Sequence, residues 1–193
     1  MKSVALKTLL GKVTASKQAR EDAALWVLRN PNVLEELLQL AVDPQQENSV
    51  KASWVLDLVV ENRIETLNPY LDTFLSGLKR VRDESALRPL ARICEQLLLE
   101  NEIQRGALSV YIGQEQLNAL TAIAFDWLIG PHKVATKVYS MSCLFIIGKQ
   151  LGWIHPELRE VLKRDFGGQS AGYRARARMI LKKIEARLAN NGR

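Results

Sequence analysis

The chain has 193 residues, of which 47% are hydrophobic and 25% are charged, and it carries a formal charge of +6. These proportions exclude a disordered chain and are typical of a soluble globular protein. Two cysteines are too few for a disulfide framework or a cysteine-rich zinc site. The longest apolar stretch, residues 138–148, is too short for a membrane span of about 20 residues. We expect a cytoplasmic protein with no membrane segment, no metal and no cofactor.

Leucine, alanine, arginine and glutamate are abundant and no segment shows a strand pattern, which predicts an all-α protein. Apolar residues at helical spacing predict helices, in chain order, at 2–11, 15–29, 32–42, 47–61, 65–81, 84–100, 114–129, 133–150, 156–166 and 170–189. Pro89 falls inside one of them, and we place it in the first turn, where a missing N–H is tolerated.

A basic residue recurs near the start of every second predicted helix. These residues are Arg20, Lys51, Arg88, Lys137 and Arg174, at intervals of 31, 37, 49 and 37 residues. A small residue usually follows three positions later, and Trp54 is the exception. Each repeat is expected to be a helix opened near a proline, a short turn and a second helix with the basic residue. The longest interval holds about 12 extra residues, which we place in an irregular insertion at 100–113.

Two of the repeats resemble HEAT repeats. One carries Leu37-Leu38, Val42-Asp43-Pro44 and Val50-Lys51-Ala52, and the other carries Asn68-Pro69-Tyr70-Leu71, Asp83 and Leu87-Arg88. HEAT repeats are antiparallel helix pairs with an aspartate between the helices and a Val-Arg pair in the second. The resemblance spans about residues 15–189 and implies a right-handed α-α superhelix of about four to five helix pairs in a single domain, 1–193. The interval of 31 and the insertion leave an irregular α-α superhelix open as the alternative.

Nothing in the sequence forms a recognisable catalytic motif. The two histidines, His132 and His155, stand beside prolines at predicted helix starts, where a structural role is expected. Phosphate-binding loops, nucleophile elbows and zinc-protease motifs are missing. We therefore predict that the chain is not an enzyme. A HEAT-like DNA glycosylase is the remaining enzymatic alternative, and its base-reading residues are not matched here.

The C-terminal end is strongly basic. Residues 131–193 hold 13 Lys and Arg against 4 Asp and Glu, whereas residues 1–130 hold 14 against 17. In the last predicted helix, Arg174, Arg178 and Lys182 form one stripe at helical spacing, and Arg176, Lys183 and Arg187 form a second. Several cations on one surface are typical of phosphate binding. No aromatic residue is interleaved with them, so a solvated or protein-binding face is the alternative.

The repeated cations have two interpretations. They form either a row of binding residues or a ladder of ion pairs between repeats, with partners such as Asp43 or Asp83. We favour the ladder, which comprises Arg20, Lys51, Arg88 and Lys137, with Arg174 at its end. Trp153 lies in a turn, and if it is exposed it is a candidate interface anchor.

The sequence thus predicts a non-enzymatic protein–protein interaction scaffold that binds a partner on a concave face. The alternative is a nucleic-acid-binding module that uses the basic C-terminal helices. The candidate binding surface consists of Arg174, Arg176, Arg178, Lys182, Lys183 and Trp153. Self-association through an end repeat stays open.

Overall fold

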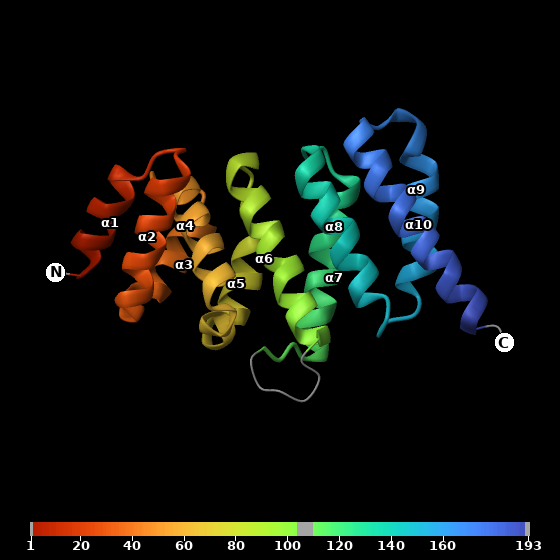
Figure 1. The fold of residues 1–193 in the computed structure, drawn as a ribbon, viewed down its shortest axis with the longest axis horizontal. Helices are drawn as coiled ribbons and strands as arrows, with labels where there is room; N and C mark the ends of the chain where they lie inside the picture. The colour runs from red at the N-terminus through yellow and green to blue at the C-terminus, as the bar shows by residue number, and fades with distance from the viewer. Residues whose placement is uncertain (1, 104–109, 192–193) are drawn as a thin grey trace. The chain divides into compact units, whose positions relative to one another are not determined.

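The computed structural model describes residues 2–103 and 110–191, and every regular element within those ranges is helical. The all-α prediction is therefore confirmed, with ten α-helices in the described ranges (Figure 1). The chain forms two compact units, Met1–Tyr111 and Ile112–Arg193, which we call the N-terminal unit and the C-terminal unit. Their boundary falls in the predicted insertion, of which residues 104–109 lie outside the described residues. A single domain and a HEAT superhelix stay predictions.

The N-terminal unit contains six α-helices, all within the described residues 2–103, and two 3₁₀ segments. They are α1 (Lys2–Lys12), α2 (Lys17–Arg29), η1 (Pro31–Val33), α3 (Leu34–Val42), α4 (Ser49–Asn62), η2 (Ile64–Tyr70), α5 (Leu71–Leu78) and α6 (Glu84–Ile103). The helix predicted at 65–81 is the one that differs most from the structure. Pro69 falls in η2 and the α-helix begins only after it, because proline lacks the N–H that an α-helix interior requires.

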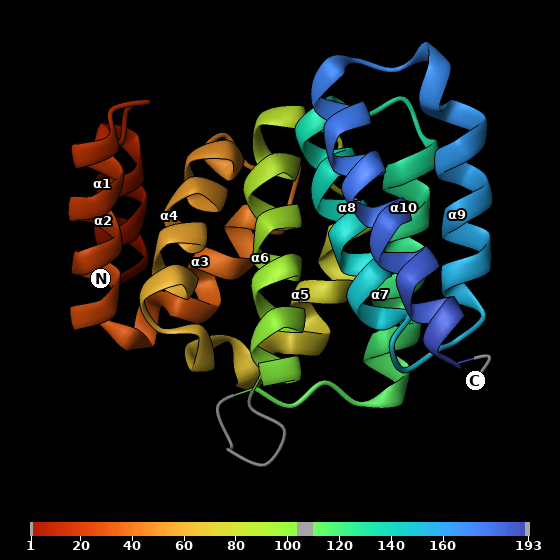
Figure 2. The same ribbon diagram turned by 45° about the vertical axis from the view of Figure 1, so that its right-hand side comes forward.

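Helix α4 is the centre of this unit. It packs against its own first helix, α3, and against the two second helices beside it, α2 and α6. Figure 2 shows α4 and α6 in front of α3 and α5. The apolar residues of α4 follow helical spacing and are buried at Ala52, Val55, Leu56, Val59 and Val60. Phe74 of α5 and Leu87 and Leu90 of α6 complete the core of the unit, with no exposed surface.

The C-terminal unit contains α7 (Gln114–Ile129), α8 (Val134–Ile147), α9 (Ile154–Asp165), η3 (Phe166–Gly168) and α10 (Ala171–Asn191). Helix α8 packs against α7, α9 and α10, and it is buried over most of its length, as its apolar sequence predicts. Helix α10 buries Tyr173, Ala177, Ile180 and Ile184, which share one face at helical spacing. Leu188, near the end of the helix, is 38% exposed. No helix of the described ranges has the length and apolar content to cross a bilayer.

Pro89 lies in the second turn of α6, not in the first turn as predicted, because the helix begins at Glu84. A proline there cannot donate the helical hydrogen bond to the carbonyl four residues earlier, which belongs to Ser85. The indole Nε1–H of Trp54 donates to that carbonyl instead, at 3.1 Å. Because Trp54 belongs to α4, the bond satisfies the acceptor and joins α4 to α6. This accounts for a large side chain where the other repeats carry a small one.

A double-mutant cycle tests this substitution of one donor by another. Trp54→Phe keeps an aromatic ring and removes the donor to the Ser85 carbonyl, which is exposed and can bind water instead, so it should destabilise the protein by about 0.5–1.5 kcal/mol in urea unfolding. In a Pro89→Ala background the restored amide N–H serves that carbonyl, and the same change should be less destabilising by roughly 0.5 kcal/mol. Equal effects in both backgrounds would contradict the assignment.

Candidate binding surface

The structure places all five repeated cations at the same level of the second helices. Arg20, Lys51, Arg88, Lys137 and Arg174 fall between the third and fifth residues of α2, α4, α6, α8 and α10. The first helix of four pairs, in contrast, carries acidic residues in its first turn. They are Glu35 and Glu36 in α3, Asp72 in α5, Glu115 in α7 and Glu157 in α9. Acids suit the positive end of a helix dipole and cations oppose it. The repeated cations therefore stand at an unfavourable end of each helix.

Two of these cations bind groups of a neighbouring helix. The ammonium of Lys51 donates to the carbonyl of Gly11 at 3.0 Å, at the carbonyl end of α1, where a cation is favourable. The guanidinium carbon of Arg20 lies 5.9 Å from the centre of the Trp54 ring, and its Nε donates to the Ser16 carbonyl at 3.3 Å. Trp54 thus connects α2, α4 and α6.

The predicted ion-pair ladder is not seen among the described residues. Asp43 accepts hydrogen bonds from the amide of Gln45 and the side chain of Gln46, and Asp83 accepts one from the amide of Ser85. Each aspartate therefore caps its own turn, which satisfies it locally. Within residues 2–103 and 110–191, none of the five repeated cations forms a salt bridge with either aspartate.

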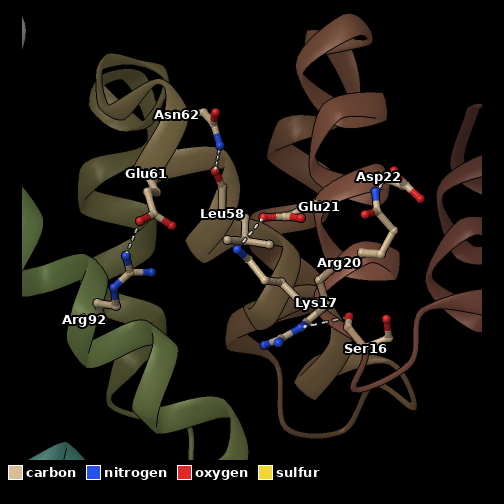
Figure 3. Close-up of polar contacts among 10 residues, drawn as sticks. Ser16, Lys17, Arg20, Glu21, Asp22, Leu58, Glu61, Asn62 and Arg92 are labelled. Carbon is tan, nitrogen blue, oxygen red and sulfur yellow. Dashed lines mark hydrogen bonds and ion pairs between the residues drawn. The ribbon is translucent and has the colours of Figure 1, made fainter.

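Arg92, one turn after Arg88, makes the inter-helix ion pairs of the N-terminal unit. Its guanidinium donates to Asp57 at 2.9 Å and to Glu61, both on α4. Figure 3 shows the contact between Arg92 and Glu61. Sequence reasoning missed this cluster, although Asp57 and Glu61 stand four residues apart on one helix face. Lys17 and Glu21 of α2 pair at 3.4 Å beside it, so this face carries balanced charge.

Asp57 is the buried member of this cluster. Its side chain is 13% exposed, and its Oδ1 is buried without a hydrogen bond from any described residue. Burial raises the pKa of Asp57 to about 6, since the attraction of Arg92 only partly offsets the loss of hydration. The charged carboxylate is therefore stabilised by Arg92, which Glu61 also uses, with a smaller contribution from Arg88.

The C-terminal unit carries the excess positive charge. It holds 13 Lys and Arg against 6 Asp and Glu, or +7, whereas the N-terminal unit holds 14 against 15, or −1. The predicted surface residues Arg174, Arg176, Arg178, Lys182 and Lys183 all lie on α10. Arg178, Lys182 and Lys183 are exposed, and Arg174 and Arg176 are half-buried. Arg174, Arg178, Lys182 and Lys183 form no ion pair with any described residue.

Aromatic rings from neighbouring segments lie beneath several of these cations, which corrects the expectation of no aromatic interleaving. The ammonium groups of Lys149 and Lys183 lie 5.2 and 5.6 Å from the centre of the Phe145 ring. Arg178 lies 5.4 Å from the ring centre of Phe166. Such contacts fix the positions of exposed cations. Both rings lie outside α10, so a helical-wheel analysis of α10 alone misses them.

Two further arginines connect α10 to α8 and to the segment that follows it. Arg176 donates to the hydroxyl of Ser142 on α8, and Arg187 donates to the carbonyl of Lys149, just after α8, at 3.4 Å. Lys149 and Lys183 lie over the Phe145 ring, and Arg187 contacts the backbone of Lys149.

His155 lies behind this group of cations and has a structural role, as predicted. Its ring is 3% exposed, stacks on Phe145 at 5.3 Å and donates from Nε2 to the Phe145 carbonyl at 2.9 Å. Gly148 makes room for the ring, because a Cβ there would lie 2.3 Å from His155 Cδ2. Burial, together with the nearby Arg187 and Lys149, lowers the pKa of His155. The neutral imidazole is therefore the form that fits the fold.

Trp153 is 57% exposed and lies immediately before α9, in agreement with its expected place in a turn. Its ring stacks on Phe125 of α7 with centres 6.2 Å apart. The same connection between α8 and α9 carries Lys149, so an exposed aromatic ring and a cation share one short segment.

No group of three or more His, Cys, Asp or Glu in the described ranges is placed to hold a metal ion. Comparisons with protein-family models, curated proteins and solved structures find no match for this chain.

Asp57 predicts a pH dependence of stability. Because its pKa is raised in the folded state, Asp57 stabilises the fold most when it is protonated. This contribution to the free energy of unfolding is complete below about pH 4 and is lost as pH rises through about 6. Asp57→Asn should remove this component, so the stability difference between wild type and variant should change by about 1–3 kcal/mol over that range. Urea unfolding at each pH measures it. Glu61→Gln, which alters the more exposed carboxylate of the same cluster, should retain the pH dependence.

His155 predicts the opposite direction. Its lowered pKa means that its contribution is present above about pH 6.5 and is lost on acidification. The melting temperature of the wild type should therefore fall more steeply below pH 6.5 than that of His155→Gln, which keeps an N–H donor but does not titrate. His132→Gln is the matched control and should behave as wild type. Parallel pH profiles for wild type and His155→Gln would contradict the assignment.

Proposed function

We propose that this chain is a non-enzymatic binding module whose C-terminal unit binds the phosphate backbone of a nucleic acid through the basic face of α10. The observation that carries the proposal is the set of cations on α10 that form no ion pair with a described residue, namely Arg174, Arg178, Lys182 and Lys183. Glu185 is the single acid in this helix. A polyanion supplies the missing counter-charge and releases its own counterions on binding.

The contacts beneath these cations support the same conclusion. Lys183 and Arg178 rest on Phe145 and Phe166, so less side-chain freedom is lost when a phosphate binds. These two cations are therefore partly positioned in the free protein before any phosphate binds.

A protein–protein interaction scaffold, the first prediction from the sequence, is the second candidate. The exposed Trp153, supported from below by Phe125, favours it. Tryptophan held in one position is a frequent anchor of protein interfaces. The balanced charges of α2, α4 and α6 also suit a protein partner better than a polyanion.

Fluorescence anisotropy with labelled random-sequence DNA and RNA, single- and double-stranded, tests the first candidate. We expect micromolar binding at low salt that weakens steeply as salt rises. The double variant Arg178→Glu with Lys182→Glu should weaken binding about tenfold or more and reduce the slope of log K against log salt by about 2.

Lys7→Glu with Lys12→Glu makes the same change of charge at two exposed lysines of the N-terminal unit. This control should bind as wild type does. Equal loss in both double variants would mean that net charge acts without a defined surface. No binding of the wild type at low salt would remove the nucleic-acid candidate and leave the scaffold.

A further inference from the structure

The first turns of α8 and α10 lie against each other in the C-terminal unit. A Cβ built on Gly172, the second residue of α10, would lie 3.8 Å from Val134 Cγ1, at the first residue of α8. The first amide N–H groups of a helix have no partner within it, and they form the positive end of its dipole. Two such ends therefore meet at one place.

Neither of these first turns contains an acidic residue. Helix α8 is preceded by Lys133 at its N-cap, which makes no side-chain capping bond. The arrangement differs from α3, α5, α7 and α9, whose first turns each contain an acid. The pair of helix ends thus adds positive potential to a region that already has excess positive charge.

The side chain of Lys137 is the observation that indicates a ligand at this place. It is only 8% exposed, and within the described ranges it forms no hydrogen bond or ion pair through its side chain. Long side chains in a helix run back toward its N-terminus. We therefore expect the ammonium of Lys137, the fourth residue of α8, to lie beside the first turn of its own helix. The stem of the side chain is buried while its nitrogen reaches solvent, so an anion can approach the charge there.

Arg174 brings a second cation from the facing helix. It is the fourth residue of α10, is half-buried, and forms no ion pair with a described residue. The nearby acids do not neutralise it, since Asp165 at the end of α9 is held by Arg164 at 2.7 Å. Asp126, in the last turn of α7, makes no salt bridge with Lys137 in the described part of the chain.

We propose that the first turns of α8 and α10 form a site for one phosphate-type oxyanion, with Lys137 and Arg174 as its charged ligands. The planar guanidinium pairs two N–H groups with two oxygens of such an anion, the ammonium neutralises a third, and first-turn amides donate to the remainder. The site goes beyond the proposed nucleic-acid surface, because it takes a single compact anion and depends on a lysine of α8. A free phosphate and a phosphate of a nucleic acid present the same chemistry.

Thermal unfolding of the full chain in inorganic phosphate, against chloride at equal ionic strength, tests the site. We expect phosphate at tens of millimolar to raise the melting temperature of the wild type by a few degrees. Lys137→Met keeps the unbranched buried stem and removes the charge, and it should lose this shift. Lys182→Met makes the same change at an exposed lysine of α10 and should keep it.

Arg174→Gln is the second variant, in case Lys137→Met fails to fold, and it should reduce the shift at least severalfold. A wild type that gains nothing from phosphate beyond chloride would overturn the site, and so would an undiminished shift in both Lys137→Met and Arg174→Gln. The double variant Arg178→Glu with Lys182→Glu should retain the shift, so the site is tested separately from nucleic-acid binding.

A second experiment, a titration with oligonucleotides, distinguishes the two sources of the anion. If the site takes a terminal phosphate of a nucleic acid, a 5′-phosphorylated oligonucleotide should bind more tightly than its unphosphorylated form, and Lys137→Met should abolish the difference. If the site takes free phosphate, the two oligonucleotides should bind equally while the thermal shift depends on Lys137. Either result supports the site once the thermal shift has been lost in Lys137→Met.

Discussion

The second helix of a pair must bury apolar residues on three sides, and the remaining features of both units follow from that constraint. Helix α4 meets α2, α3 and α6, and helix α8 meets α7, α9 and α10. Little of their surface is left for polar groups. The side chains of Lys137 on α8 and Asp57 on α4 are therefore largely buried although they can carry charge. Asp57 is paired with Arg92, whereas Lys137 has a buried stem and a nitrogen that reaches solvent.

The helices and most of their boundaries can be predicted from the sequence, because apolar spacing and proline positions are local signals. Pro69 and Pro89 show where local reasoning fails. The sequence pattern predicts that Pro69 belongs to an α-helix at 65–81, whereas the chain forms a 3₁₀ segment around it. Pro89 was assigned to a first turn, and its actual position in the second turn depends on a donor from another helix.

The candidate surface was predicted only in part. The positions of the cations on α10 follow from helical spacing, and the exposure of Trp153 follows from its turn. The contacts that organise the cations do not, since Phe145 and Phe166 come from other segments. The partners proposed for the ion-pair ladder, Asp43 and Asp83, are a related case. Aspartates beside turns are satisfied by nearby amides, and sequence spacing alone does not distinguish capping from pairing across helices.

The bond from Trp54 to the Ser85 carbonyl has an evolutionary consequence. While proline occupies position 89, replacing the indole at position 54 removes an N–H donor as well as bulk. The two sites are therefore epistatic, and the order of substitutions matters. A lineage that replaces the proline first is free to replace the tryptophan afterwards, whereas the reverse order passes through an intermediate with an unsatisfied carbonyl. Divergence at these positions should have a preferred direction, imposed by a single hydrogen bond.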